Sequence, residues 1–253
     1  MKRLIIILTL FLTVLNCSDA ANVKTVTKDY KIVTQDGFSM TAKLEYPKVK
    51  SKKDFATVVF LHSLGYSSEW WGTLPDDLLD KGYAVVLIDL RGHGNSVYNS
   101  KLTRVSWTNM KNKAYAKYPT DVITVLDYIK AGNKRTFFNE WAFVGSDIGA
   151  ATAVHVADTI SYKPKTIVML SPVVQSKGIF VPVKFAELND IDVLAIAGKT
   201  DVNGFNTNNY LKKFAQSTFV EYISESKSTG MIMLKNDDSL SRVIVEWIQQ
   251  YIK

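Results

Sequence analysis

Five short, continuous apolar segments most strongly limit what this chain can fold into. They occupy residues 56–61, 83–89, 141–144, 166–170 and 192–197. Such runs are typical of strands that are buried on both faces of a parallel sheet. Helical spacing of apolar residues appears between and after them, at 73–81, 119–130, 148–160 and 237–253. This alternation predicts an α/β protein with a mostly parallel sheet and helices on both faces.

An antiparallel hairpin is predicted before the first of these runs. Residues 24–34 and 38–46 have the composition of strands, and Gln35-Asp36-Gly37 joins them through an Asp-Gly pair that favours a tight turn. A last strand is expected at 218–224. Because no internal repeat or linker interrupts the chain, residues 25–253 are expected to form one domain.

The composition excludes several classes of protein. The 253 residues are 47% apolar and 22% charged, close to the average for soluble globular proteins, which excludes a disordered chain and a polytopic membrane protein. One cysteine, Cys17, excludes a disulfide scaffold. From Cys17 onward, 29 basic residues face 24 acidic ones, a surplus of +5. Without a long basic run this predicts no nucleic-acid partner, and is compatible with contact to anionic surfaces or with no specific partner.

The N-terminus has the pattern of an export signal. Lys2 and Arg3 precede a twelve-residue apolar stretch at 4–15, which is too short for a secure membrane anchor. Residues 14–17 resemble a lipobox, although Asn16 matches it poorly, and processing there would leave a signal peptide at 1–16, a lipidated Cys17 and a spacer at 17–24. Cleavage after Ser18-Asp19-Ala20 would instead release a soluble periplasmic or secreted protein. We favour the membrane-associated lipoprotein, because the lone cysteine lies at the end of the apolar stretch.

A strand–turn–helix motif marks the expected site. The strand at 141–144 continues into Gly145-Ser146-Asp147-Ile148-Gly149 and then into the helix at 148–160, which is the context of a G-x-Nu-x-G nucleophile elbow. His62-Ser63-Leu64-Gly65 follows the first apolar run, and Asp201 follows the fifth. All these segments come directly after strands.

In these motifs and their order, residues 35–253 resemble the α/β-hydrolase family, in particular small bacterial members of the dienelactone-hydrolase and serine-aminopeptidase type. The resemblance implies an α/β-hydrolase fold without a sizeable cap domain, because only residues 171–191 separate the fourth and fifth apolar runs. It also implies an oxyanion hole from the amides of Leu64 and Ile148. The triad positions would be Asp147, Asp201 and Thr229.

Two of these three positions depart from the family pattern. Asp147 stands where these relatives carry serine, and Thr229 stands where they often carry histidine. His62, His93 and His155 all precede Asp201, whereas the family order places the histidine after the acid. Threonine cannot accept a proton near neutral pH. The sequence therefore predicts a catalytically inactive pseudoenzyme that binds an unknown small molecule or protein partner.

Asp147 allows a second interpretation. Haloalkane dehalogenases and epoxide hydrolases use an aspartate at the elbow as nucleophile, so an active esterase-, epoxide- or haloalkane-type hydrolase is the alternative, although it also needs a histidine. In the structural interpretation, aspartate tolerates the positive φ of the turn. Its charge is also favoured at the start of the helix at 148–160, whose amides should lower its pKa.

The remaining candidates have structural interpretations. We expect His62 and His93 to make structural hydrogen bonds and His155 to lie too far from the elbow to act there. Asp201 could cap the turn before Asn203-Gly204. Trp70 and Trp71 are expected to pack beside the mouth of the pocket. No Cys/His cluster, EF-hand, Walker loop or GxGxxG occurs, so neither a metal nor a nucleotide cofactor is predicted.

Overall fold

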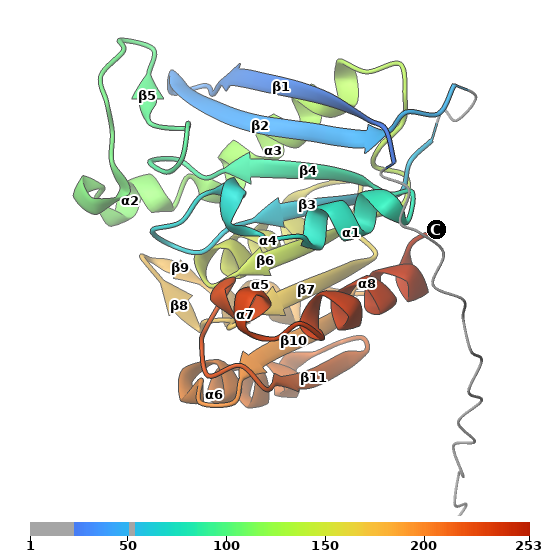
Figure 1. Ribbon diagram of the computed structural model, residues 1–253. Coiled ribbons are helices and arrows are strands. Elements are labelled where there is room, and N and C mark those ends of the chain that lie inside the picture. The colour runs from blue at the N-terminus through green and yellow to red at the C-terminus, as the bar shows by residue number, and fades with distance from the viewer. Residues whose placement is uncertain (1–22, 51–53) are drawn as a thin grey trace, which may run out of the picture.

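A mixed β-sheet forms the centre of the computed structural model (Figure 1), which describes residues 23–50 and 54–253. The predicted signal peptide and Cys17 lie outside the described residues. In the described chain, nine strands form the main sheet in the order β1-β2-β4-β3-β6-β7-β10-β11, with β5 paired to β2. Their bounds are β1 Thr25–Val33, β2 Phe38–Pro47, β3 Thr57–Leu61, β4 Ala84–Asp89, β5 Tyr98–Asn99, β6 Trp141–Ser146, β7 Thr166–Leu170, β10 Asp192–Gly198 and β11 Phe219–Ser224.

The predicted mixture of parallel and antiparallel pairing is confirmed. β1 and β2 form an antiparallel hairpin, and β2 also pairs antiparallel with β4. The pairs from β4 through β3, β6, β7 and β10 to β11 are all parallel. The five central strands are buried along almost their whole length, which explains why their sequences are continuously apolar.

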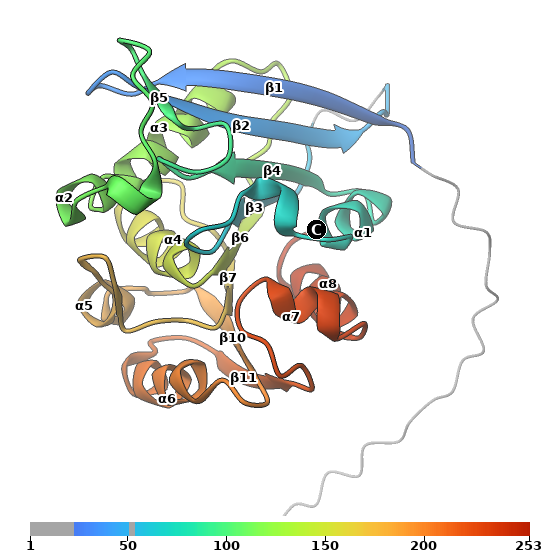
Figure 2. The same cartoon turned by 60° about the vertical axis from the view of Figure 1, so that its left-hand side comes forward.

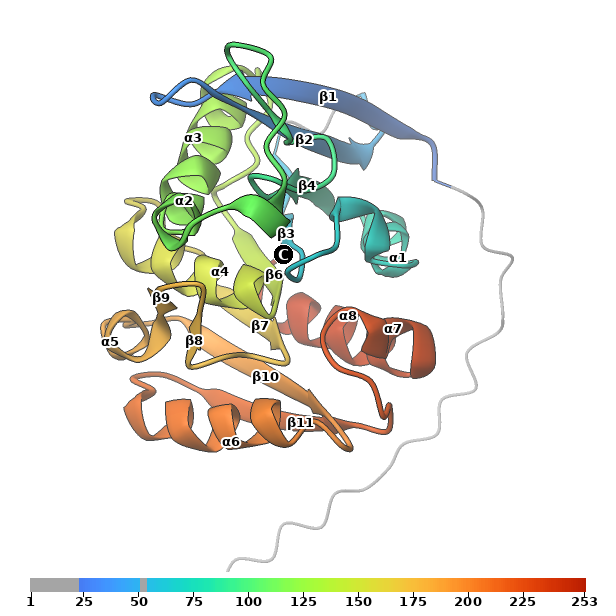
Figure 3. The ribbon, with the colours of Figure 1, turned by 90° about the vertical axis from the view of Figure 1, so that its left-hand side faces the viewer.

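Helices cover both faces of the sheet, as predicted (Figure 2 and Figure 3). One face carries α1 Leu74–Asp80, α7 Ile232–Asn236 and α8 Leu240–Tyr251. The other carries α3 Tyr118–Ala131, α4 Ile148–Thr159, α5 Val181–Ala186 and α6 Val202–Leu211, and α2 Asn112–Tyr115 lies beyond them. Each layer encloses its own cluster of buried apolar side chains. Between β7 and β10 the chain forms only a small hairpin, β8 Gln175–Ser176 and β9 Ile179–Phe180, and α5, so the expectation of no sizeable cap is confirmed.

Helix α6 was not predicted from the sequence, nor were the short helices α2, α5 and α7. The α6 sequence is rich in asparagine and contains Gly204, both poor helix formers. The helix forms because Leu211 packs in the core and the Asn208 side chain donates a hydrogen bond to the Ala195 carbonyl of β10. The helix expected at 237–253 begins later, at Leu240. The Asp237 side chain instead accepts hydrogen bonds from the hydroxyls of Ser224 and Ser239, in the segment that precedes the helix.

The direction of the strands gives the sheet two different edges. The register places the first residues of the parallel strands, such as Thr57, Ala84 and Trp141, beside one another. Thr25 pairs with Pro47 at this same amino edge, so the described chain begins there. The loops after β3, β6, β7, β10 and β11 all leave from the opposite, carboxyl edge, on the left of Figure 1.

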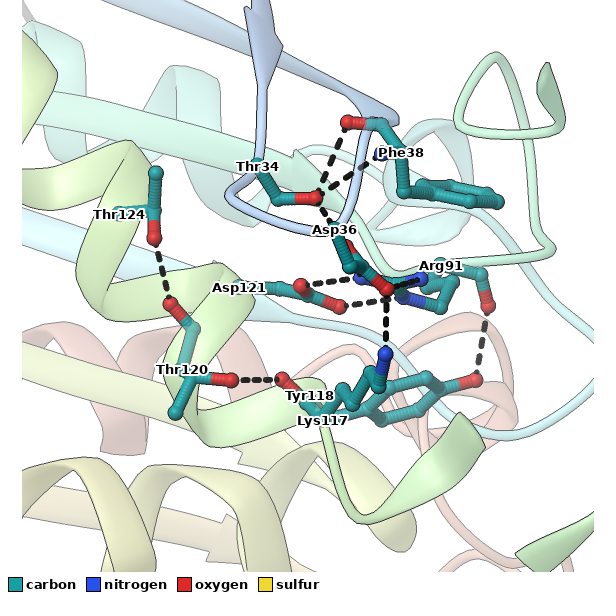
Figure 4. A network of polar contacts seen from close by, with 9 residues as sticks. All are labelled: Thr34, Asp36, Phe38, Arg91, Lys117, Tyr118, Thr120, Asp121 and Thr124. Atoms are coloured by element: carbon teal, nitrogen blue, oxygen red, sulfur yellow. Dashed lines mark hydrogen bonds and ion pairs between the residues drawn. The ribbon is translucent and has the colours of Figure 1, made fainter. Parts of the chain in front are cut away.

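A buried arginine joins the hairpin to the loop after β4 (Figure 4). Arg91, only 6% exposed, donates to the Asp121 carboxylate of α3 at 2.7 and 2.8 Å and to the Asp36 carboxylate at 2.8 and 2.9 Å. Its guanidinium also lies 4.3 Å from the centroid of the Phe38 ring. The Arg91 guanidinium holds the pKa of the Asp36 carboxyl well below its ordinary value. Three segments distant in sequence are thus fixed by one charge-assisted network.

This network predicts a large effect of truncating Asp121. Asp121→Ala leaves the buried Arg91 with one carboxylate instead of two, so we expect the free energy of unfolding to fall by about 3 kcal/mol. The matched control is Glu246→Ala on α8, whose ion pair with Arg242 is exposed and 4.0 Å long; it should cost under about 1 kcal/mol. Urea unfolding measures both. Equal losses in the two variants would contradict the structural role of the network.

Candidate active site

A cavity of about 590 Å³ opens at the carboxyl edge of the sheet. The loops after five parallel strands contribute to its wall, which is where α/β sheets bind ligands. Its lining residues are Ser63, Leu64, Tyr66, Asp147, Ser171, Pro172, Val173, Asp201, Asn203, Gly204, Lys227, Ser228, Thr229, Gly230 and Ile232. The predicted site residues Leu64, Asp147, Asp201 and Thr229 therefore share one cavity.

Asp147 occupies a strained turn between β6 and α4. Its φ of 51° and ψ of −117° depart from the conformations that most residues adopt. The turn is closely packed: a Cβ atom at Gly149 would lie 1.9 Å from the Leu61 carbonyl oxygen, and one at Gly145 would lie 2.6 Å from the Ala150 Cα. Both flanking glycines are therefore required by packing, and the backbone has the form of a nucleophile elbow.

The Asp147 carboxylate lies against the amide that would form half of an oxyanion hole. The Leu64 amide donates to Asp147 Oδ2 at 3.2 Å. Burial raises the pKa of Asp147 above its ordinary value, whereas the Leu64 and Ile148 amides and the positive charge of Lys177 act in the opposite direction. Our expectation that the helix amides would lower this pKa was wrong, because the loss of hydration outweighs their contribution.

Ser146, the serine next to Asp147, is not among the residues that line the cavity. It ends β6, is fully buried, and its Oγ lies 2.6 Å from the Oγ of Ser63, with which it shares a hydrogen bond. A Cβ at Gly230 would lie 2.8 Å from Ser63 Oγ and 2.9 Å from Ser146 Oγ, so the Gly230 backbone covers this serine pair.

Asp201 caps α6 through only one of its two carboxylate oxygens. Its Oδ1 accepts a hydrogen bond from the Gly204 amide at 2.9 Å. Its Oδ2 is buried and has no hydrogen-bond partner within the described residues. In a complete triad the acid would accept a hydrogen bond from the histidine at such an oxygen. Asp201 therefore has one carboxylate oxygen that could accept a further hydrogen bond, and no imidazole lines the cavity beside it.

Thr229 lies in the loop after β11, at the position where the resemblance to relatives led us to expect a histidine. Thr229 is exposed and lines the cavity, as do its neighbours Lys227 and Ser228. The Gly230 amide donates to Ser171 Oγ at 2.7 Å, which ties this loop to the loop after β7. None of the residues that line the cavity is a histidine. The cavity lining therefore has a carboxylate at the elbow and no imidazole.

Sequence analysis missed two contributors to this site. Ser171 has a φ of 46° and directly follows β7, so its position after a predicted strand could have identified it. Lys177 lies in the β8–β9 turn, a hairpin that the sequence did not reveal. Its charge acts on Asp147, which only the folded structure shows.

His62 and His93 hold the loop that carries Leu64. His62 Nε2 accepts a hydrogen bond from the Leu90 amide, and His93 Nε2 accepts one from the Gly65 amide, both at 2.9 Å. Burial lowers the pKa of each histidine to about 4, so both are neutral near neutral pH. The loop at 62–65 is thereby fastened to the loop after β4, which Arg91 anchors in turn.

Trp70, Trp71 and His155 lie in three different surroundings. Trp71 is 1% exposed and packs against Phe60 in the core, so its expected place beside the pocket mouth was wrong. Trp70 is 53% exposed and its ring meets that of Tyr66, which lines the cavity. His155 Nε2 lies 2.9 Å from the Phe180 carbonyl oxygen, on the side of α4 that faces α5.

Within residues 23–50 and 54–253, no group of histidine, cysteine or acidic side chains has the arrangement of a metal site. The helices of this described portion are also all too short or too polar to cross a membrane.

The histidine geometry predicts a pH dependence of stability. In the unfolded chain His93 becomes protonated below about pH 6.5, whereas in the folded chain its pKa is lowered to about 4. Protonation therefore favours the unfolded chain between these two values, and the contribution of His93 should lower the free energy of unfolding across this window by on the order of 3 kcal/mol. His62 acts in the same direction, whereas the raised pKa of Asp147 acts in the opposite one.

Urea unfolding of wild type and His93→Gln isolates the contribution of His93. Glutamine retains an acceptor for the Gly65 amide but does not titrate. The difference in stability between the two proteins should shrink as the pH falls from 7 toward 4. A difference that stays constant over this range would show that His93 does not carry the effect.

Comparison with known proteins supports the architecture. The family model for serine aminopeptidase, S33, matches residues 52–215. The esterase Pf2001 of Pyrococcus furiosus is similar in structure with a TM-score of 0.70 at 15% identity, covering 90% of this chain and 91% of the esterase. The Exiguobacterium antarcticum esterase EaEST gives 0.66 at 12% identity, covering 87% and 98%. A candidate dienelactone hydrolase from Klebsiella pneumoniae gives 0.65 at 16% identity, covering 90% and 100%.

A search of curated proteins finds no match. At these identities the structural similarities establish the fold alone, whereas the family model covers more than half of the sequence and includes the elbow. Sheet order, elbow backbone and family model agree with one another and with the resemblance that the motifs indicated. The chain is a member of the S33 serine aminopeptidase-like family of α/β hydrolases.

Proposed function

We propose that this protein is an exported, lipid-anchored member of the family that has lost hydrolytic activity and uses the cavity at the carboxyl edge to bind a small molecule or a partner. One observation carries the loss of activity: the Asp147 carboxylate accepts a hydrogen bond from the Leu64 amide, at the place where a substrate oxyanion would be stabilised. A negative charge at that position opposes the negative charge that develops on a substrate carbonyl oxygen.

The absence of a histidine among the cavity residues supports the same conclusion. Ester or peptide hydrolysis by this fold needs an activated nucleophile and later an activated water. His62 and His93 accept backbone hydrogen bonds through Nε2 and are buried away from the cavity lining. The hydroxyls of Ser63, Ser171 and Thr229 have no imidazole among the cavity residues to accept their protons.

An active Asp147-based hydrolase is the second candidate, and the elbow backbone favours it. Asp147 adopts the strained conformation that presents a nucleophile. In such an enzyme Asp147 would attack carbon and form an ester, and a base would activate the water that releases it. The lack of a histidine in the lining disfavours the second of these steps.

The cavity wall favours a polar ligand. Two carboxylates, Asp147 and Asp201, face the same space as the hydroxyls of Ser171, Ser228 and Thr229. Carboxylates accept hydrogen bonds, and hydroxyls both donate and accept them. A ligand with several hydroxyl or amine groups matches this wall better than a purely apolar one does.

Restoring the triad tests the proposed loss of activity. Asp147→Ser combined with Thr229→His returns a nucleophile and a base to a cavity that already has Asp201, and removes the charge beside the Leu64 amide. We expect esterase activity on short acyl esters at least about 100-fold above wild type. Each single change should have little effect, because triad members act as a unit.

The matched control is Asp147→Ser with Thr229→Gln, which fills the same loop without supplying a base. It should remain inactive. Wild-type protein that hydrolyses these esters as fast as the restored variant would contradict the proposal. A restored variant that folds but stays inert would show that the triad positions alone do not account for the inactivity.

Membrane attachment through Cys17 is tested separately. Two acyl chains on a processed N-terminal cysteine give stable anchoring, whereas a single chain is marginal. Cys17→Ser should therefore move the protein from the membrane fraction to the soluble fraction, or leave the signal peptide uncut. Fractionation and intact-mass measurement would refute the lipoprotein assignment if wild type and variant behaved identically.

A further inference from the structure

We propose that the amino edge of the sheet rests on an anionic lipid surface, with the cavity facing away from it. The proposal rests on the proposed lipid anchor for the position of the chain start, and it adds a defined membrane-facing surface and an orientation. Its partner is a bilayer that contains acidic phospholipids.

The first step is the position of the chain start. Cys17 is separated from Val23, the first described residue, by six peptide units, which span at most about 20 Å when fully extended. Thr25 lies at the amino edge, paired with Pro47. A lipid on Cys17 would therefore hold the amino edge close to the bilayer.

The second step is the charge of this edge. Among the described residues, the segments before β1, after β2, before β6 and before β7 carry seven basic side chains and two acidic ones, a local surplus of +5. We call this set the basic edge, and it consists of Lys24, Lys48, Lys50, Lys134, Arg135, Lys163 and Lys165 together with Asp54 and Glu140.

Hydrogen bonds join three of the segments that carry the basic edge. The Lys48 amide donates to the Lys24 carbonyl at 2.7 Å, and Arg135 Nη2 donates to the Val49 carbonyl at 3.0 Å. The Phe55 amide donates to the Thr136 carbonyl at 2.9 Å, which places the end of the β2–β3 loop beside the residues that precede β6.

Most of this charge points to solvent. The side chains of Lys24, Lys48, Lys50 and Lys134 are all exposed. Of the acidic pair, Glu140 is engaged by Lys165 at 3.6 Å. A solvated cluster of lysines is the kind of surface that anionic headgroups attract, and this attraction fades within about 8 Å at physiological salt. The short connection to Cys17 allows the basic edge to come that close to the headgroups.

The third step is orientation. Asp147, Ser171 and Thr229 follow the carboxyl ends of β6, β7 and β11 and line the cavity at the opposite edge. A strand such as β6, with six residues, spans about 20 Å. With the basic edge on the bilayer, the cavity opens toward the solvent, where a soluble ligand or partner can reach it.

Vesicle binding tests this surface without the lipid anchor. The protein is the mature chain, residues 17–253, with Cys17→Ser, which keeps every described residue of the fold. It is mixed with vesicles of phosphatidylcholine alone, or of phosphatidylcholine with phosphatidylglycerol, and cosedimentation is measured. We expect binding only to the vesicles that contain phosphatidylglycerol, and we expect added salt to weaken it.

The variant Lys24→Glu/Lys48→Glu/Lys50→Glu should lower the partition coefficient at least about tenfold. The matched control reverses three exposed lysines outside the basic edge, Lys101→Glu/Lys111→Glu/Lys113→Glu, so that the net charge is the same. The control should bind within about twofold of the parent. Circular dichroism melting of both variants confirms that they are folded.

Three results would overturn the proposal: no binding by the parent protein, equal binding to vesicles without phosphatidylglycerol, or equal losses in the two triple variants. Because the tested protein carries no lipid, its failure to bind would leave lipidation at Cys17 and the loss of hydrolysis untouched. Conversely, a protein that is not lipidated in cells would still give a clear result in this assay.

Discussion

The close approach of Gly149 to the end of β3 is the constraint on which the site depends. Since a Cβ there would overlap the Leu61 carbonyl oxygen, α4 can begin immediately beside β3 only with glycine at this position. In the same turn, residue 147 has a positive φ and its side chain accepts a hydrogen bond from the loop at 62–65. The rest of the site is arranged around this turn. His62 and His93 hold the loop at 62–65 on one side of the turn, and Ser171 holds the loop after β11 on the other.

The requirements of folding and those of catalysis are separate at this elbow. The turn needs small flanking residues and a central residue that tolerates positive φ, and aspartate meets that need. Catalysis needs in addition a free oxyanion hole and a base. In this structure the Asp147 carboxylate accepts a hydrogen bond from the Leu64 amide, and Asp201 caps α6.

The sequence predicted the parts of the structure that depend on continuous or periodic burial. The five apolar runs became β3, β4, β6, β7 and β10, and the Asp-Gly turn became the β1–β2 hairpin. Prediction from the sequence failed where tertiary contacts determine the local structure. α6 forms despite its asparagines because it packs on β10, and Trp71 enters the core although it neighbours the exposed Trp70. The pKa of Asp147 was misjudged for the same reason: the helix amides are visible in the sequence pattern, but the burial that outweighs them is a property of the folded site.

The central claim is that Asp147 does not act as a nucleophile, and intact-protein mass spectrometry tests it most directly. Wild-type protein is incubated with a short acyl ester, an epoxide and a haloalkane, and then denatured rapidly in acid. Since no histidine lines the cavity to activate the water that would hydrolyse an ester on Asp147, we expect any such intermediate to accumulate and be detected. The account predicts an unmodified mass with every reagent. An adduct that maps to Asp147 and is absent in Asp147→Asn would contradict it.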